Sequence, residues 1–342
     1  MSQYLVLSKI KVQKANCVAG FTWGFPAITH FLGFTHALQR KLAEDFDIVF
    51  SGCAVVSHAY QLHVYKPKPK ANFEFIQSRN PPVLERHKNG KKVPIIEEGK
   101  MNLTVSLVIE LSKELIANLE QIEDFKKMVK EKCLTSRLAG GSVLSIGQVN
   151  FLAASTQEQT ENLNRRIKRL TMPGFVLQDR SEYLKQHFEQ LHANNPDAEL
   201  LDAWLDFSAL KYRAVPKLND DEQPDEKTDA NWEQVPKPFK GWLVPVMTGY
   251  KAISEHYAPD EVGDLRVSDK DDSVTHCCFV EAVHSIAEWK GLHRIKDIST
   301  MIWKYHYEDD WYLCTQQIQS PQESPIETQN HPLSFENAIA NL

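Results

Sequence analysis

The chain has 342 residues, of which 42% are hydrophobic and 25% are charged, and its formal net charge at pH 7 is −6. This composition predicts a folded protein with enough length for two units. No stretch approaches the roughly 18 consecutive apolar residues of a membrane span, so we expect a cytoplasmic protein. A protein that binds nucleic acid through its overall charge is usually basic, so any such binding must come from local basic patches.

The cysteine pattern predicts neither a disulfide framework nor a metal site. None of the six cysteines belongs to a CxxC pair, and two of them are adjacent, which suits neither a disulfide nor zinc. We expect free, mostly buried thiols in a reducing compartment. The six are Cys17, Cys53, Cys133, Cys277, Cys278 and Cys314.

The first elements follow from apolar periodicity. Residues 4–12 predict a strand, and residues 25–43 predict an amphipathic helix with Pro26 in its first turn, where proline is tolerated. Residues 48–65 are rich in valine and tyrosine, and they predict one long strand or two strands joined at a bulge near Gly52.

A basic insertion then separates these elements from the next strand. Residues 66–100 are rich in proline, lysine and asparagine, and they predict an extended loop or a hairpin insertion. Residues 101–110 alternate apolar and polar side chains and predict a strand. Ser112 is predicted to cap a helix that runs to Val129, and residues 142–146 predict a closing strand.

The predicted order is β-α-β-insertion-β-α-β, which is typical of a ferredoxin-like or RNA-recognition-motif domain of the α+β class. We therefore expect a body at residues 1–155 with an inserted loop or hairpin at 66–100. A more irregular α+β part is expected at residues 156–342, with an acidic loop at 216–240. The order alone is common, so it supports RNA binding only weakly.

The second half of the chain gives weaker signals. Residues 181–192 and 198–212 predict helices from the spacing of their leucines and aromatics. Two further helices are predicted at about residues 279–290 and 297–307.

Catalytic and metal-binding motifs are missing from the sequence. It contains no HExxH, no GxSxG and no phosphate-binding Walker loop. Its 13 histidines are scattered, and His58 and His63 are predicted on opposite faces of one strand. We therefore predict no catalytic residue, metal or cofactor, although a metal-independent RNA-cleaving site built from His, Lys and Tyr stays an open alternative.

Two basic segments are candidates for phosphate binding. Lys66, Lys68 and Lys70 alternate with proline and alanine, and they fit equally a finger along a phosphate backbone and a solvated loop. For the densest basic cluster we favour binding to nucleic acid, because the forked guanidinium of arginine matches the geometry of phosphate. The alternative is a basic helix end that neutralises nearby carboxylates. It contains Arg165, Arg166, Lys168 and Arg169.

Two other features suit contacts with nucleotides. Arg137 precedes Gly140, Gly141 and Ser142, and glycines let the backbone approach a phosphate closely, although a simple turn explains them equally. Trp242 and Tyr250 could stack on bases, although buried packing is the commoner use of such residues.

Taken together, these segments resemble a known family. The resemblance extends over roughly residues 4–310, and it is carried by TWGFP at 22–26, FLGFTHALQR at 31–40, SRNP at 78–81, IEEG at 96–99, RLAGGS at 137–142, RL at 169–170, PGF at 173–175, GWLVP at 241–245 and GY at 249–250. The chain is similar to the Csy-two family, the Cas-five-type subunit of type I-F CRISPR surveillance complexes.

The resemblance implies a function that composition does not show. It implies a non-catalytic RNA-binding subunit that holds the 5′ handle of the CRISPR RNA in antiviral defence. It also identifies the insertion at residues 66–100 as thumb-like. The implied partners are a Cas-eight-type large subunit and the first Cas-seven-type backbone subunit. Some Cas-five relatives cut RNA, so a processing endoribonuclease is the alternative. The expected RNA contacts are Arg79, Asn80, Arg137, Gly140, Gly141, Ser142, Arg165, Arg166, Arg169, Trp242 and Tyr250.

Overall fold

A computed structural model describes residues 2–79, 95–97, 99–217, 228–258 and 277–316. The chain forms two compact units. Unit 1 consists of residues 1–178, 246–284 and 290–327, and unit 2 consists of residues 179–245, 285–289 and 328–342. In the described residues, no helix is long and apolar enough to cross a membrane.

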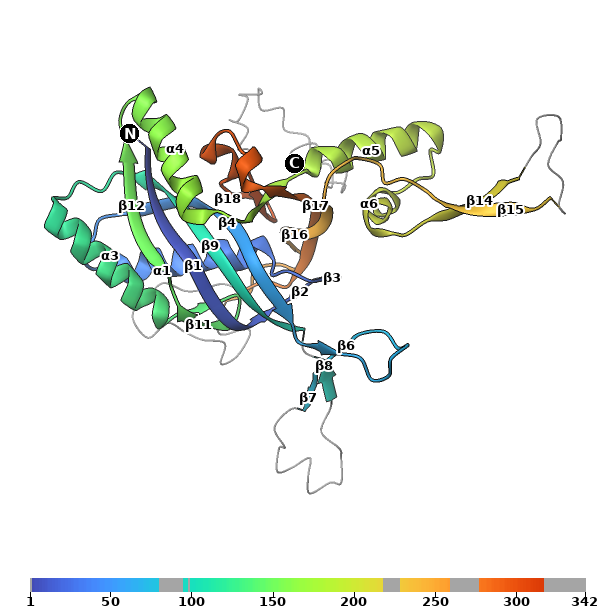
Figure 1. Ribbon diagram of the computed structural model, residues 1–342, viewed down its shortest axis with the longest axis horizontal. Coiled ribbons are helices and arrows are strands. Elements are labelled where there is room, and N and C mark those ends of the chain that lie inside the picture. The colour runs from blue at the N-terminus through green and yellow to red at the C-terminus, as the bar shows by residue number, and fades with distance from the viewer. Residues whose placement is uncertain (1, 80–94, 98, 218–227, 259–276, 317–342) are drawn as a thin grey trace, which may run out of the picture. The chain divides into compact units, whose positions relative to one another are not determined.

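Unit 1 is built on a large antiparallel sheet (Figure 1). Strand β1 (Ser2–Asn16) lies between β9 (Lys100–Lys113) on one side and β11 (Gly141–Ser145) and β12 (Gln148–Ala154) on the other. Strand β4 (Val49–Leu62) pairs with the far side of β9. The strands expected near residues 4–12, 48–65, 101–110 and 142–146 are therefore confirmed.

Two helices connect these strands. Helix α1 (Ile28–Leu42) lies between β1 and β4 in the chain, and α3 (Leu119–Leu134) lies between β9 and β11. The α+β class is thereby confirmed. The predicted cap at Ser112 is wrong, because this residue belongs to β9. Helix α3 instead begins after Asn118, whose side chain accepts a hydrogen bond from the backbone N–H of Gln121.

Both faces of this sheet are covered. Tyr4 and Val6 of β1 belong to a buried cluster with Leu163 and Ile167 of α4 (Gln157–Thr171). Leu5 and Leu7 of β1 point to the opposite face and are also buried. Because both faces are covered, residues 3–8 form a continuous buried run and not an alternating one.

The sheet continues beyond β4 in the order β4-β13-β17-β16-β19-β18. These strands are β13 (Phe175–Asp179), β16 (Leu243–Ala252), β17 (Val280–Gly291), β18 (Lys304–Glu308) and β19 (Trp311–Thr315). The helices predicted at 279–290 and 297–307 are wrong. The first segment is β17, and the second is a short 3₁₀ turn, Ile298–Met301, followed by β18.

Short strand pairs extend unit 1 beyond the ends of β4 and β9 (Figure 1). β5 (Val64–Tyr65) pairs with β6 (Glu74–Phe75), and β7 (Gln77–Arg79) pairs with β8 (Ile95–Glu97). The described part of the 66–100 insertion therefore contains short antiparallel strand pairs. Residues 80–94 lie outside the described residues. Nearby in sequence, β2 (Val18–Ala19) and β3 (Thr22–Trp23) form another small hairpin.

Unit 2 contains two helices and a hairpin. Helices α5 (Ser181–Asn194) and α6 (Leu200–Ser208) confirm the two predicted helices, although α6 ends early. Strand β14 (Tyr212–Pro216) pairs with β15 (Ala230–Gln234). The prediction of a loop over 216–240 is therefore wrong at β15, and residues 218–227 lie outside the described part.

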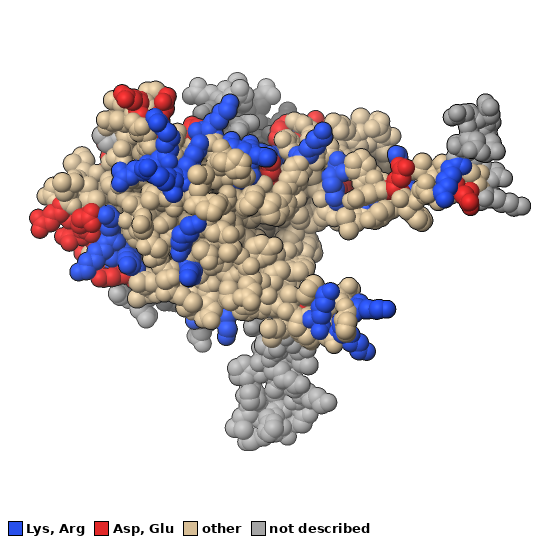
Figure 2. Space-filling model, in the orientation of Figure 1, with Lys and Arg blue, Asp and Glu red and all other residues tan. Residues whose placement is uncertain are grey.

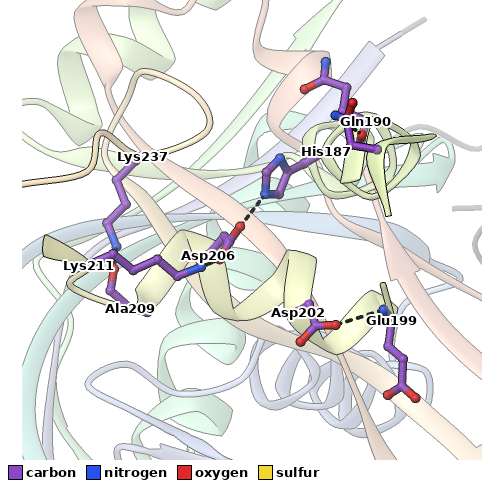
Figure 3. A network of polar contacts seen from close by, with 9 residues as sticks. His187, Gln190, Glu199, Asp202, Asp206, Ala209, Lys211 and Lys237 are labelled. Atoms are coloured by element: carbon purple, nitrogen blue, oxygen red, sulfur yellow. Dashed lines mark hydrogen bonds and ion pairs between the residues drawn. The ribbon is translucent and has the colours of Figure 1, made fainter. Parts of the chain in front are cut away.

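A polar network fastens α5 to α6 in unit 2 (Figure 3). His187 Nε2 lies 2.9 Å from Asp206 Oδ2, and Lys211 forms an ion pair with the same carboxylate. Burial alone raises the pKa of Asp206, but hydrogen bonds from Lys211 and His187 outweigh it and hold this pKa below its usual value. The aromatic core beneath includes Phe207 and the partly buried Phe239.

Candidate nucleic-acid interface

Helix α4 presents the densest group of cations in the described part of the chain. Leu163, Ile167 and Thr171 occupy its buried face. Arg165, Arg166 and Arg169 are exposed and line one open hollow together with Asn162. Figure 2 shows Lys and Arg side chains gathered over this helix. The helix therefore brings together the three arginines that the sequence identified.

These arginines have no carboxylate partner in the described part of the chain. None of them takes part in the ion pairs found there. Helix α3 differs, because its lysines and carboxylates are mixed, with Lys126 Nζ lying 2.8 Å from Glu123 Oε1. Among the described residues, the arginines of α4 thus form no ion pair with a carboxylate and stay available to an external anion.

The glycine pair lies in a tight hairpin turn. β10 (Arg137–Leu138) pairs with β11, so Arg137 lies opposite Ser142. The two turn residues, Ala139 and Gly140, have φ values of 50° and 74°. A two-residue turn with both φ values positive matches the twist of a hairpin, so the turn alone accounts for Gly140.

Gly141 is required for packing against β1. A Cβ at this position would lie 2.6 Å from the carbonyl oxygen of Gln13 and 2.7 Å from the backbone nitrogen of Ala15. Both are backbone atoms that cannot move aside easily. Arg137 and Ser142 next to this turn are exposed. The structure thus gives the glycines a structural reason and leaves Arg137 accessible.

The remaining predicted contacts lie elsewhere. Arg79 is a residue of β7 and lies opposite Ile95, whereas Asn80 lies outside the described residues. Trp242 belongs to unit 2, is exposed, and accepts a hydrogen bond through its carbonyl from the backbone N–H of Trp289. Tyr250 belongs to unit 1, where it lies on β16 and packs against Ala27 and Met247.

Tyr250 is one member of a tyrosine row that the sequence analysis missed. It lies opposite Tyr312 of β19, which in turn lies opposite Tyr307 of β18. Tyr305 stacks on Tyr312 with ring centroids 5.4 Å apart, and His36 also stacks on Tyr305 with ring centroids 6.2 Å apart. The alternation of Tyr305 with Tyr307 was the available signal, but it was hidden by the helix predicted there.

The insertion combines cations with aromatic rings. Lys66 Nζ lies 4.6 Å from the ring centroid of Phe73, which is 61% exposed. Trp23 of the β2–β3 hairpin meets Phe75 edge-on at 4.9 Å. Lys66, Lys68 and Lys70 are exposed, so this surface offers both positive charge and ring faces.

A cluster around His58 joins segments that are distant in sequence. His58 Nδ1 lies 2.6 Å from the carbonyl oxygen of Pro173, and Nε2 lies 2.6 Å from Ser106 Oγ. Lys9 Nζ approaches the same Nδ1 to 2.9 Å. Burial lowers the pKa of His58, and the neighbouring Lys9 lowers it further.

This cluster bears on the alternative of an RNA-cleaving site. His58 and Lys9 are types of residue that transfer protons in such sites. However, both ring nitrogens of His58 face protein groups, and Ser106 is fully buried. The ring therefore acts as a structural tie in this arrangement. In the described residues, no group of three or more His, Cys, Asp or Glu side chains could hold a metal ion.

Comparisons with known proteins agree with the family resemblance. Residues 5–314 match the family model described as CRISPR-associated protein (Cas_Csy2). A curated relative, CRISPR-associated protein Csy2 of Pseudomonas aeruginosa (strain UCBPP-PA14), is 34% identical over 315 residues, which cover 90% of this chain and 92% of the relative. The chain therefore belongs to the Csy2 family of CRISPR-associated proteins of type I-F systems.

Proposed function

We propose that this chain is a non-catalytic, RNA-binding structural subunit of the type I-F CRISPR ribonucleoprotein. In this role it binds the 5′ handle of the CRISPR RNA and joins the Cas-eight-type large subunit to the first Cas-seven-type backbone subunit. Membership of the Csy2 family supports a place in that complex. The observation that carries RNA binding is the group of three exposed arginines on α4 without carboxylate partners.

The physical argument for phosphate binding is direct. An arginine fork donates two parallel hydrogen bonds to phosphate oxygens, and Arg165, Arg166 and Arg169 present three such forks around one hollow. Their position in the second half of α4 lets the negative end of the helix dipole stabilise them in the free protein. Charge in this density positions a backbone and discriminates little between bases.

The sheet supports a ferredoxin-like or RNA-recognition-motif-like reading of the body. The chain order β1-α1-β4-β9-α3-β11 combines with the sheet order β11-β1-β9-β4. This is the order expected of two interlocked β-α-β halves. We propose that residues 1–155 form this body with the insertion at 66–100 as its thumb, and that residues 156–342 complete it and meet the partners.

The other expected contacts divide by chemistry. Arg79, Asn80 and Arg137 would contact phosphates or base edges, and Gly140, Gly141 and Ser142 would let the backbone approach a nucleotide. Trp242 and Tyr250 would stack on bases, because unpaired RNA bases are read by stacking and by their edges. Arg137 is exposed beside the hairpin turn, so we expect it to discriminate the native handle from a scrambled one.

The test neutralises α4 in the assembled complex. The Arg165→Gln, Arg166→Gln, Arg169→Gln triple variant should weaken binding of native and scrambled handles alike. Each lost phosphate contact should reduce the log–log salt slope by about 0.7, so three contacts give about 2.

The matched control removes three charges from α3 by Lys127→Gln, Lys130→Gln and Lys132→Gln, and it should leave the slope unchanged. Wild-type affinity and slope in the α4 variant would instead assign the cluster to a solvated or protein-facing surface.

A further inference from the structure

Lys9 is held in an unusual backbone conformation on β1. The pairing of β1 with β9 runs through Leu7 opposite Leu107 and resumes at Ile10 opposite Val105, which leaves a bulge between them. Lys9 occupies this bulge with a φ of 53°, a region that lysine seldom adopts. Bulges redirect side chains and are frequent next to functional sites.

The bulge aims the Lys9 ammonium at His58. Nδ1 of His58 lies 2.6 Å from the Pro173 carbonyl oxygen, and two acceptors approach this closely only with a proton between them. Nδ1 therefore donates to Pro173, and Nε2 accepts from the hydroxyl of Ser106. Ser106 Oγ in turn accepts the backbone N–H of Lys9 at 2.9 Å.

This assignment leaves the Lys9 ammonium facing a donor. Its Nζ lies 2.9 Å from an Nδ1 whose lone pair is replaced by a proton, so Nδ1 cannot accept a hydrogen bond from it. No ion pair in the described part of the chain includes Lys9. The amine is half-buried, and burial lowers its pKa. A cation beside an N–H group with no carboxylate is complementary to an anion.

The site lies at the end of the arginine helix. Helix α4 contacts β1 and ends at Thr171, and the carbonyl that holds His58 belongs to Pro173, two residues further on. Arg169 lies in the last turn of the same helix. Through His58, Lys9 is therefore linked to the segment that directly follows α4. Figure 2 shows Lys and Arg side chains over both α4 and β1.

We propose that Lys9 binds a phosphate of the RNA backbone next to those held by α4, with the β1 bulge holding its backbone in place. This inference rests on the proposed RNA-binding function and adds a positioned contact to it. The phosphate oxygen would supply the acceptor that the described residues do not. Because the bulge and the hydrogen bond from the Lys9 backbone N–H to Ser106 Oγ set the position of the Lys9 backbone, the contact has a fixed register relative to β1.

The test compares two lysines of the same strand in the assembled complex. Lys9→Met should lower affinity for the handle RNA and reduce the log–log salt slope by about 0.7, and Lys9→Arg should restore the slope. Lys11→Met is the matched control, because Lys11 is exposed on β1 and paired with Thr104, and it should leave the slope unchanged.

Thermal unfolding of each variant separates binding from folding. The Lys9→Met protein should unfold at the wild-type temperature or above, because its ammonium has no acceptor to lose. A lower unfolding temperature with an unchanged salt slope would make Lys9 a structural residue and overturn the inference. An unchanged slope in the α4 triple variant would instead overturn the proposed function, so the two failures are distinguishable.

Discussion

His58 connects three segments of unit 1 through one ring. Its contacts reach Pro173, Ser106 and Lys9, which lie on or beside β13, β9 and β1. Burial holds the folded-state pKa of His58 below the 6.5 of an exposed histidine. As the pH falls, the unfolded chain therefore takes up the proton first, and the folded state loses relative stability.

We predict that the protein loses stability as the pH falls below about 6.5, toward the lowered folded pKa. Above that range the contribution of His58 is fully present. His58→Gln, which cannot titrate, should lose less stability than wild type between pH 7 and pH 5 in thermal unfolding. The control His256→Gln changes an exposed histidine, and its pH profile should follow wild type. If the His58→Gln variant and the wild type lose the same stability between pH 7 and pH 5, the prediction is wrong.

Gly141 illustrates a glycine that sequence alone could not explain. We predict that Gly141→Ala destabilises the protein by about 1–3 kcal/mol, because the added methyl group would meet the backbone of Gln13 and Ala15. Gly33→Ala is the matched control, since a Cβ there meets nothing within 4 Å and the residue lies inside α1. That change should stabilise the protein by about 0.5–1 kcal/mol. Denaturant unfolding measures both, and equal effects would contradict the packing argument.

At the scale of elements, the β14–β15 hairpin has two different faces. Residues opposite each other in an antiparallel pair share a face. The register places Tyr212, Ala214 and Pro216 with Gln234, Trp232 and Ala230, so this face carries no charge. Arg213 and Glu233 share the other face. Trp232 is 75% exposed although a two-stranded hairpin is only marginally stable alone, which favours a protein partner on the uncharged face.

We predict that Trp232→Ser leaves the thermal stability of the isolated chain unchanged, because the ring is exposed. The same change should reduce the amount of large subunit that co-purifies with it, because aromatic side chains supply much of the energy of such interfaces. Glu233→Gln is the control from the other face and should leave co-purification at the wild-type level. Equal recovery of the partner with both variants would exclude this face from the interface.

Helices and strands were predicted correctly where the apolar residues followed one clear periodicity. The prediction failed where the apolar residues fitted both the spacing of a strand and that of a helix. Residues 101–107 alternate strictly between apolar and polar side chains and form part of β9. In β17, Val283, Ile286 and Ala287 also fit a helical spacing, and neighbouring strands decide the outcome. The helix predicted over 297–307 failed for the same reason, and with it the tyrosine row was missed.

The candidate site shows the same limit. The arginines of α4 lie within five residues of sequence, so local density alone identified them. Lys9 and His58 are 49 positions apart, and only the pairing of β1 and β4 with β9 brings them together. A single sequence does not show how β1 and β4 are aligned against β9, whereas it does show that several arginines lie close together in one helix.

At the scale of the whole molecule, charge and apolar exposure point to assembly. The chain has a net charge of −6, yet four of its cations lie together on α4. Large apolar side chains are exposed at several places, including Phe21 at 88% and Ile116 at 92%. Such surfaces are typical of chains that meet partners.

If the proposed partners cover these side chains, the isolated chain should self-associate at concentrations where the complex stays monodisperse, and this is our prediction. Size-exclusion chromatography with light scattering compares the two samples, and co-expression of the large subunit should suppress the association. An isolated chain that is monodisperse and gains nothing from the partner would contradict this.

The sheet of unit 1 draws its strands from both ends of the sequence, and this sets a constraint on synthesis. Trp303 is fully buried and bridges to Cys53 of β4, and the strands that follow it, β18 and β19, lie after residue 303. The ribosome must therefore deliver most of the chain before the sheet can close. Until then β4 lacks its last neighbour, so the growing chain needs protection from misfolding.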